Sequence, residues 1–396
     1  MDKKMSCQVR HGIIYTLYMT LPIVQTDVPL GYIDLGSGNP SLDLLPIEML
    51  QRASELYFSS GDRRTLQYGA EHGIGYFLTA LAEFLSAYLQ LQVNSDALLV
   101  TNGASAALDM LCTLYTKPGD LIFVEEPTYF LARSIFADHK LQIETISVDQ
   151  DGMDIDEVEK KLSREMPKFV YTIPTFHNPA SVTLSQDRRD RLVNLAQQED
   201  ILIIADEVYQ FLAYDHEPPE PMAVFSSQIE QVISINSFSK ILAPGLRLGW
   251  IQTHPEVLSR LVRSGLLDSG GGMNPFTSAI AYYLIQAGDL ADNIARLKGI
   301  YQHRLAAMDK ALGLYLPEAE YTAPHGGYYF WVRFPGMDVS KMRARAWKSK
   351  IDFRPGELFS SQMGLQEYMR LSISYYDAPQ IEQGIMELAK CLRGGD

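Results

Sequence analysis

The chain alternates between short apolar runs and longer stretches with amphipathic periodicity. Each apolar run is followed by small or polar residues, which is the pattern of buried strands that end in loops. We expect strands over residues 98–100, 121–124, 169–173, 201–205, 232–235, 329–332 and 368–374. Helical periodicity is found over residues 46–59, 78–89 and 187–198. The alternation of the two between residues 98 and 250 predicts an α/β fold with a mostly parallel central sheet and helices on both faces.

The composition narrows the class of protein. The 396 residues hold enough apolar side chains for a sizeable core. The formal net charge of −14 argues against a nucleic-acid partner, because phosphate binding needs a basic surface. The three cysteines, Cys7, Cys112 and Cys391, are far apart in the sequence, so they indicate neither a disulfide framework nor a metal site. The expected location is therefore the reducing cytoplasm.

An apolar run near the N-terminus has some features of a targeting segment. Lys3, Lys4 and Arg10 precede residues 12–24, which superficially resemble a signal peptide. No small-residue cleavage site follows, Pro22 interrupts the run, and it is too short to cross a bilayer as a helix. We therefore expect an N-terminal arm that packs on the protein, and no membrane association.

A single lysine follows the predicted strand 232–235. Ser237 and Ser239 precede Lys240, and Arg247 follows it. Burial beside a like charge lowers the pKa of an amine, and such an amine can attack a carbonyl to form a Schiff base. The two hydroxyls and the guanidinium suit a phosphate dianion. Together these residues suggest pyridoxal 5'-phosphate with its aldehyde on Lys240. The alternative is an exposed lysine on a turn.

Two other predicted strands end in residues that suit the same ligand. Gly103, Ala104 and Ser105 lie where a strand gives way to a helix, so free N–H groups and the positive helix end can hold an anion. An ordinary turn with a polar N-cap is the alternative there. Asp206 lies at another strand end, where its carboxylate would keep a pyridine nitrogen protonated.

Residues 237–250, SFSKILAPGLRLGW, resemble the cofactor-lysine motif of the fold-type I pyridoxal-phosphate-dependent aminotransferases, class I/II. The nearest group is the 2-aminoadipate/kynurenine aminotransferases. Further matching motifs occur in the family's order over nearly the whole chain. The resemblance implies the pyridoxal-phosphate-dependent transferase fold of type I, and a homodimer with both sites at the interface.

The resemblance also implies how the cofactor is held. Tyr129 is expected to stack on the cofactor ring, while Asn178 and Tyr209 bond its phenolic oxygen. Asp206 is expected to pair with the ring nitrogen, and the motif serines and arginine with the phosphate. Tyr68 matches a tyrosine that reaches across the dimer interface to the partner's cofactor phosphate.

The substrate contacts implied by the resemblance are Gly38, Asn178 and Arg370. Guanidinium suits an α-carboxylate because its planar fork binds both oxygens. Lys240 is the expected general base, with Asp206 and Tyr209 as the other catalytic residues. His177, beside the Asn-Pro pair, is expected to be a supporting polar group.

The predicted reaction moves an amino group between an L-amino acid and a 2-oxo acid through the Lys240 Schiff base. The amino acid side chain is aromatic, 2-aminoadipate-like or otherwise long, and no second arginine identifies a distal carboxylate. One alternative is a pyridoxal-phosphate-dependent lyase, decarboxylase or oxidase on the same scaffold. Two others are a regulator fused to a DNA-binding helix-turn-helix, which the acidic chain disfavours, and an inactive interaction protein, which the intact chemical residues disfavour.

Two domains are expected. A large cofactor-binding domain covers residues 46–285, and a small α+β domain combines residues 1–45 and 286–396. The glycine run within residues 269–272 is expected to form a flexible break near the boundary.

Overall fold

An eight-stranded sheet forms the centre of the computed structural model, which describes residues 8–10, 13–15, 24 and 28–393. The strand order is β4-β11-β10-β9-β8-β5-β6-β7. The bounds are β4 (Leu98–Thr101), β5 (Leu121–Glu126), β6 (Gln142–Asp149), β7 (Gly152–Met153), β8 (Phe169–Thr172), β9 (Leu202–Asp206), β10 (Val232–Ser237) and β11 (Gly249–Thr253).

The sheet is mostly parallel, as the sequence predicted. Strands β6, β5, β8, β9 and β10 pair in parallel with one another. Strand β11 runs antiparallel to both β10 and β4, so β4 points the same way as the parallel strands. The loops that follow β4, β5, β8, β9 and β10 therefore meet at one edge of the sheet.

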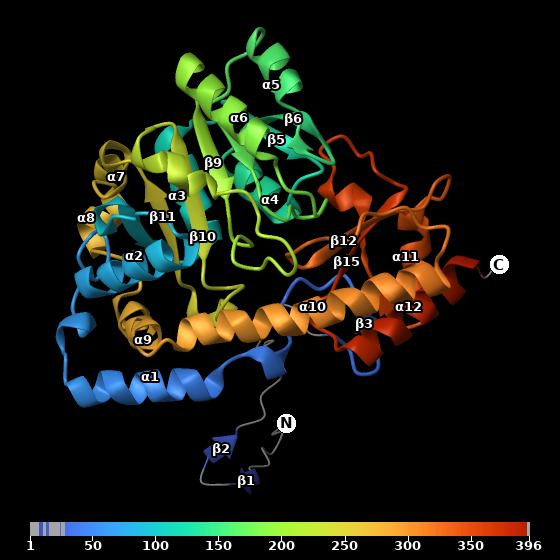
Figure 1. The fold of residues 1–396 in the computed structure, drawn as a ribbon, viewed down its shortest axis with the longest axis horizontal. Coiled ribbons are helices and arrows are strands. Elements are labelled where there is room, and N and C mark those ends of the chain that lie inside the picture. Colours follow the sequence, from blue (N-terminus) through green and yellow to red (C-terminus); the bar gives the residue numbers. More distant parts are fainter. Residues whose placement is uncertain (1–7, 11–12, 16–23, 25–27, 394–396) are drawn as a thin grey trace, which may run out of the picture.

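Helices cover both faces of this sheet (Figure 1). Phe169 and Tyr171 of β8 face a core built with α2 (Gly75–Leu89), α3 (Ala104–Tyr115), α4 (Phe130–Asp138) and α7 (Pro255–Leu261). Val170, between them, faces a second core with α5 (Ile155–Leu162) and α6 (Gln186–Glu199). Burial on both faces explains why these strands are continuously apolar in sequence.

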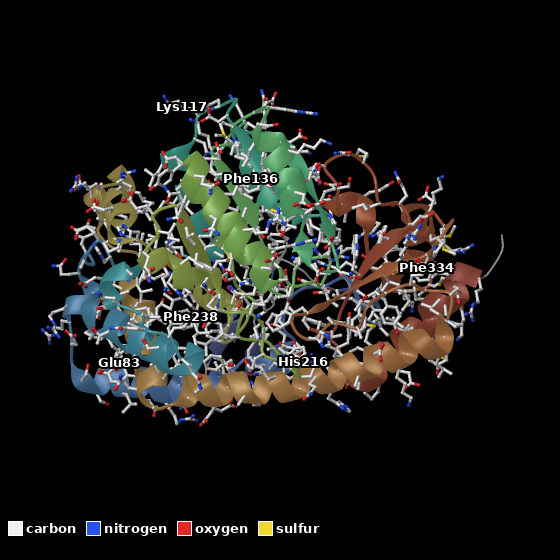
Figure 2. All side chains as sticks on the ribbon, turned by 45° about the horizontal axis from the view of Figure 1, so that its top comes forward. Glu83, Lys117, Phe136, His216, Phe238 and Phe334 are labelled. Atoms are coloured by element: carbon white, nitrogen blue, oxygen red, sulfur yellow. The ribbon has the colours of Figure 1, made fainter. Side chains whose placement is uncertain are left out.

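The C-terminal part of the chain builds a smaller sheet with its own helices. The strands β12 (Tyr329–Arg333), β15 (Tyr368–Ser372) and β14 (Arg354–Pro355) pair in that order, beside α11 (Val339–Lys348) and α12 (Ala378–Arg393). Strand β3 (Ile33–Asp34) pairs in parallel with β13 (Ile351–Asp352), so the beginning of the described chain lies with its end. Phe136 is buried under the large sheet and Phe334 in the smaller part (Figure 2).

One long helix runs past both parts. Helix α10 (Asp289–Tyr315) has 27 residues and follows α9 (Pro275–Gln286), which packs on α1 (Ile47–Ser60). Figure 1 shows α10 extending from beneath the large sheet to the smaller part. A second link is the backbone bridge between Ala213 and Gly326, beside which His325 Nδ1 lies 3.0 Å from an Asp215 carboxylate oxygen. The division at residues 45/46 and 285/286 stays a prediction.

The remaining elements are short. They are β1 (Gln8–Arg10), β2 (Ile13–Tyr15), α8 (Gly265–Gly270), and the 3-10 turns η1 (Leu42–Leu44), η2 (Arg64–Leu66), η3 (Ser95–Ala97), η4 (Met222–Ser227), η5 (Pro244–Leu246) and η6 (Gly356–Phe359). Most of the predicted arm, residues 12–24, lies outside the described residues. Within the described chain, none of the helices combines the length and apolar character needed to cross a bilayer.

The glycine run has a packing role. Gly272 forms a backbone bridge with Gly69, and a Cβ atom on Gly272 would overlap the carbonyl oxygen of Ala70. Gly271 has φ +70°, which favours glycine. Close backbone contact between two loops therefore accounts for these glycines.

Candidate active site

The predicted catalytic residues gather at the edge of the large sheet where the parallel strands end. Asp206 is the last residue of β9, and Lys240 follows β10. Asn178 lies in the loop after β8, next to a buried histidine, and Tyr129 lies after β5. Arg370 comes from β15 of the smaller sheet, so two parts of the chain contribute to one site.

The Lys240 side chain is partly buried, and its amine is surrounded by polar and aromatic groups. Its Nζ donates a hydrogen bond to the Gly38 carbonyl oxygen at 3.0 Å. Burial lowers the pKa of Lys240, and Arg370 lowers it further, while Tyr329 and Asp206 act in the opposite direction. The amine is thereby shifted toward its neutral, nucleophilic form.

The cation that acts on Lys240 is different from the one the sequence suggested. Arg247 turns away, and its Nη2 donates to the carbonyl oxygen of Asn102 at 3.0 Å. Arg370, far away in sequence, is the arginine whose charge reaches Lys240. The pKa of Lys240 is therefore lowered, as the sequence predicted, but the like charge that lowers it belongs to Arg370 and not to Arg247.

Asp206 is buried with one oxygen satisfied and one free. Its Oδ2 accepts a hydrogen bond from the Tyr171 hydroxyl at 2.9 Å, whereas its Oδ1 has no partner among the described residues. Burial raises the pKa of Asp206 to about 6, against the opposing effects of Tyr171 and Lys240. A buried oxygen without a partner is costly, and a protonated ring nitrogen would satisfy it.

The neighbouring acid, Glu207, serves the fold. Its carboxylate accepts from the backbone N–H groups of Met222 and Ala223 and from the Ser234 hydroxyl. The buried Arg189 lies 3.9 Å away. Adjacent residues at the end of a strand point to opposite faces, so one acid reaches the site and the other holds the η4 segment.

The predicted phosphate residues converge at the start of α3. Gly103 has φ +87°, and a Cβ atom there would come within 3.0 Å of Arg247 Nη2. The Ser237 hydroxyl donates to the Ser239 hydroxyl at 2.8 Å. The first N–H groups of α3, which begins at Ala104, have no intrahelical partner. Hydroxyls, a guanidinium and free helix N–H groups are the donor types that suit a phosphate dianion.

Arg370 is held by three kinds of contact. Its Nη1 donates to Asn178 Oδ1 at 2.7 Å, and its Nη2 donates to the Gly36 carbonyl oxygen at 2.8 Å. Its Cζ lies 4.0 Å from the ring centroid of Tyr329 and 4.9 Å from that of Phe359. The side chain is 3% exposed and its Nε–H has no partner in the described chain, so a further acceptor is required.

Tyr129 and Tyr209, the two aromatic residues expected to contact the cofactor of their own chain, also reach this place. Tyr209 Oη lies 3.2 Å from Tyr329 Oη, and a Cβ atom on Gly38 would overlap that same Tyr329 oxygen. Burial raises the pKa of Tyr129, and the charges that act on it include Asp206 and Arg370. The predicted phosphate residue Tyr68 is apart from the others, with 83% of its surface exposed.

Sequence reasoning missed several residues of the site. Tyr171 was treated only as part of a buried strand, although its place on the same face as Asp206 could have been read from the alternation along neighbouring strands. The contacts of Tyr329 and Phe359 with Arg370 could not be predicted, because no local signal pairs such distant segments.

His177 has the supporting role that the sequence predicted. It is 1% exposed, and its Nε2 lies 3.1 Å from Glu125 Oε2. Its Nδ1 accepts from the N–H of Ala180, and Glu125 also accepts from Thr172 and Ile173. These contacts fix the loop that carries Asn178.

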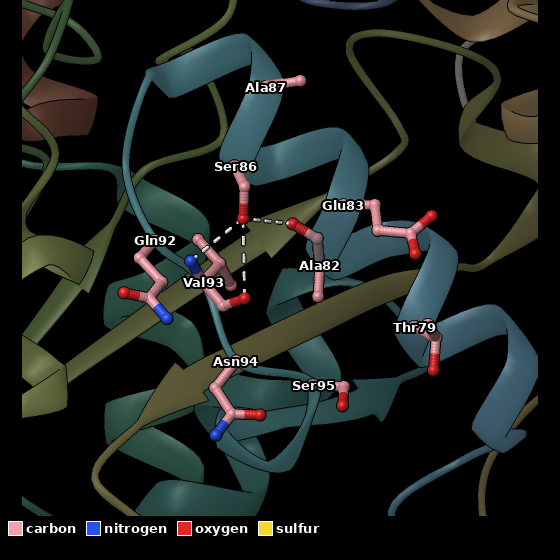
Figure 3. Close-up of a pocket in the computed structure, with 9 residues that line it drawn as sticks. All are labelled: Thr79, Ala82, Glu83, Ser86, Ala87, Gln92, Val93, Asn94 and Ser95. Carbon is pink, nitrogen blue, oxygen red and sulfur yellow. Dashed lines mark hydrogen bonds between the residues drawn. The ribbon is translucent and has the colours of Figure 1, made fainter.

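A separate surface hollow of about 710 Å³ contains none of these residues (Figure 3). It lies between α2 and the segment that leads to η3, where the Ser86 hydroxyl bonds the Ala82 and Val93 carbonyl oxygens. Its lining offers one ionisable side chain, Glu83. This hollow therefore has none of the predicted cofactor or substrate contacts.

Comparison with known proteins agrees with this geometry. Residues 31–388 match the family aminotransferase class I and II. The chain is 33% identical over 369 residues to aromatic-amino-acid aminotransferase 1 of Thermococcus litoralis, covering 91% of this chain and 88% of the relative. The solved kynurenine aminotransferase of Pyrococcus horikoshii, in complex with PMP, has a TM-score of 0.86 at 31% identity, covering 92% and 91% of the chains. The α-aminoadipate aminotransferase of Thermus thermophilus, complexed with N-(5'-phosphopyridoxyl)-L-leucine, has a TM-score of 0.84 at 26% identity, covering 93% and 95%.

The fold and the site define a pyridoxal-phosphate enzyme of fold type I. The chain belongs to the class I and II aminotransferase family. Its activity is that of an aminotransferase, and these relatives do not favour a lyase, decarboxylase or oxidase. The residues fit the cofactor, since Asp206 Oδ1 has no partner within the described chain and Gly103 leaves beside Arg247 a space that a Cβ atom would crowd.

Proposed function

We propose that Lys240, Asp206 and Arg370 carry the transamination of this enzyme. The observation that carries the proposal is their convergence. Lys240 Nζ bonds the Gly38 carbonyl oxygen and Arg370 bonds that of Gly36, and the charges of both Asp206 and Arg370 act on Lys240. The cofactor, when bound, supplies a cationic ring that accepts the electron pair released at the substrate Cα. Asp206 would hold that ring protonated through its free Oδ1.

Lys240 would act as the cofactor's attachment point and as the base that moves the Cα proton. Its lowered pKa supports both roles, because a neutral amine is needed to attack and to accept a proton. Arg370 would bind the α-carboxylate with its unsatisfied Nε–H and remaining N–H groups. Asn178 and Gly38 line the same place, and Tyr129 and Tyr209 would contact the cofactor ring and its phenolic oxygen.

We propose an L-amino acid with an aromatic or other long side chain as the substrate. The three relatives are an aromatic-amino-acid, a kynurenine and an α-aminoadipate aminotransferase. Arg354 lies beside Gly36 but is paired with Asp34 at 2.7 Å and with Asp352 at 3.0 Å. This arginine is therefore committed, which favours an aromatic side chain over a dicarboxylic one.

We also propose a homodimer with both sites at its interface. Phe58, Leu66 and Tyr68 are 67%, 70% and 83% exposed, and Phe58 lies against Phe276 with the ring centroids 6.1 Å apart. Exposed large apolar side chains that lie together are typical of a surface that a second copy covers. Sedimentation of the purified protein measures the assembly directly. Mixing Lys240→Ala with Tyr68→Ala subunits should restore activity, since a hybrid dimer has one site with both residues intact.

The function is tested by a half-reaction screen. Single L-amino acids are added to the cofactor-loaded enzyme without any oxo acid, and its visible spectrum is followed. Conversion of the cofactor to its amine form with release of a 2-oxo acid supports the proposal, and the fastest amino acid identifies the substrate class. Release of ammonia, carbon dioxide or peroxide without that conversion would overturn it. The cytoplasmic location stays a prediction.

A further inference from the structure

Tyr329, the first residue of β12, brings a second phenol to Tyr209 inside the site. Its side chain is 4% exposed, and its oxygen accepts a hydrogen bond from the Tyr209 hydroxyl at 3.2 Å. The absence of a side chain on Gly38 leaves room for that oxygen, since a Cβ atom there would overlap it. The Tyr329 hydroxyl thus lies between Gly38 and Tyr209, and Tyr209 is the residue proposed to contact the cofactor's phenolic oxygen.

Arg370 makes Tyr329 a good hydrogen-bond acceptor. The guanidinium lies 4.0 Å from the Tyr329 ring centroid and 4.9 Å from that of Phe359, and its two Nη groups donate to Asn178 and Gly36. A cation fixed at this distance attracts electron density toward itself and favours negative charge on the phenol. The carboxylate-binding arginine and the phenol pair are therefore coupled by direct contact.

The two phenols differ in acidity. Burial works to raise the pKa of Tyr329, but the charges and hydrogen bond around it lower that pKa below the ordinary 10.0. Burial and the nearby Tyr329 raise the pKa of Tyr209 well above 10.0. The titratable and charged groups that face Tyr329 are Arg370, Lys240, Tyr209, Arg354 and Tyr129. Tyr209 therefore keeps its proton and donates it, and Tyr329 accepts.

We propose that Tyr329 is a positioning residue that acts through Tyr209 and responds to the occupancy of Arg370. Without a carboxylate at Arg370, the Tyr209 hydroxyl donates to Tyr329. A substrate carboxylate neutralises the guanidinium, so the Tyr329 oxygen becomes a poorer acceptor. The hydrogen bond then reverses: Tyr329 donates to Tyr209, and the Tyr209 hydroxyl turns toward the cofactor's phenolic oxygen. Each proton stays on its own oxygen throughout.

This inference rests on the proposed roles of Arg370 and Tyr209, and it is tested first without the cofactor. The full-length chain is titrated with alkali while the ultraviolet phenolate band is recorded, with and without hydrocinnamate as an unreactive aromatic carboxylate. The wild type should show one tyrosine that ionises below pH 10, and hydrocinnamate should raise its midpoint. Tyr329→Phe should lose this tyrosine.

Tyr328→Phe is the matched control, because it removes the next phenol on the same strand. Its hydroxyl bonds the Lys240 backbone oxygen and Tyr301 instead. This control should keep the low midpoint. Tyr209→Phe should keep the ionisation of Tyr329 but raise its midpoint, because Tyr329 loses its hydrogen-bond donor. This variant tests the inference even if Tyr329→Phe folds poorly. A low midpoint that survives in Tyr329→Phe, or one that hydrocinnamate leaves unchanged, would overturn the inference.

The loaded enzyme gives a second readout. Hydrocinnamate should move the pH midpoint of the visible cofactor band in the wild type and at least threefold less in Tyr329→Phe. The variant should lose up to about tenfold in kcat with KM nearly unchanged, the scale of one neutral hydrogen bond. If the chain takes up cofactor and transaminates but Tyr329→Phe behaves as wild type, only this inference fails. If the chain takes up no pyridoxal phosphate, the proposed function fails.

Discussion

The Tyr171 hydroxyl donates to Asp206 Oδ2 at 2.9 Å, and both residues point to the same face of neighbouring parallel strands. The hydrogen bond holds one carboxylate oxygen and leaves the other, which has no partner among the residues that the structure describes, for the site. It also works against burial, which raises the pKa of Asp206 to about 6. The pair therefore sets both the direction and the charge of the carboxylate.

Asp206→Asn should change how the stability of the cofactor-free protein depends on pH. The folded pKa of about 6 lies above the unfolded value of 3.8, so the free energy of unfolding falls as the pH rises through this window. The difference between the folded and unfolded pKa corresponds to about 3 kcal/mol in the free energy of unfolding. In Asp206→Asn the free energy of unfolding should no longer fall for this reason, as measured by thermal unfolding from pH 4 to pH 7. If the free energies of unfolding of wild type and variant differ by the same amount at every pH in this range, the pKa of Asp206 is not raised. The loaded variant should also be nearly inactive.

Tyr171→Phe should make the cofactor bind more weakly at mildly acidic pH. Without the phenol, the pKa of Asp206 rises further, so the carboxylate stays protonated at a higher pH. The acid limb of cofactor affinity against pH should shift upward. Tyr214→Phe removes a different buried phenol, which bonds the Gly327 carbonyl oxygen, and should leave the limb in place. Equal shifts in both variants would point to a general packing effect.

Lys240→Ala should abolish turnover while the cofactor still binds without a covalent bond. The phosphate cradle and Asp206 remain intact in this variant, whereas the attachment point and the base are gone. Absorption spectra before and after gel filtration measure retention, and mass spectrometry after borohydride measures the covalent bond. Normal turnover in this variant would refute the assignment of Lys240.

Gly103→Ala should weaken cofactor binding and destabilise the fold by about 1–3 kcal/mol. The φ of +87° disfavours alanine, and the added Cβ atom would press on Arg247 Nη2. Gly119→Ala is the control, with φ +92° and nothing within 4 Å of the added atom. Calorimetry should show comparable backbone destabilisation in both and a loss of cofactor affinity only at Gly103. Equal affinities would remove Gly103 from the phosphate cradle.

Several strands and helices, and the grouping of residues at strand ends, could be predicted from the sequence. The strand before Lys240 and the helix after Gly103 were expected from periodicity and turn residues, and the structure has β10 and α3 there. Such features are local, because apolar spacing and the residues at strand ends depend on a few neighbours in the chain. Parallel strands then bring their end residues to one edge, so Asp206 and Lys240 could be grouped before any contact was known.

Which distant side chains come into contact depends on the tertiary structure. Arg370 and Asn178 are separated by 192 positions yet lie 2.7 Å apart, so the charge that acts on Lys240 comes from the smaller sheet and not from the nearby Arg247. Tyr329 reaches Tyr209 for the same reason. Contacts across packed layers depend on how two sheets approach each other, and no short stretch of sequence encodes that approach. The chemical groups and their positions at strand ends can therefore be predicted from short stretches of sequence, whereas the electrostatic interactions between distant groups depend on the tertiary structure.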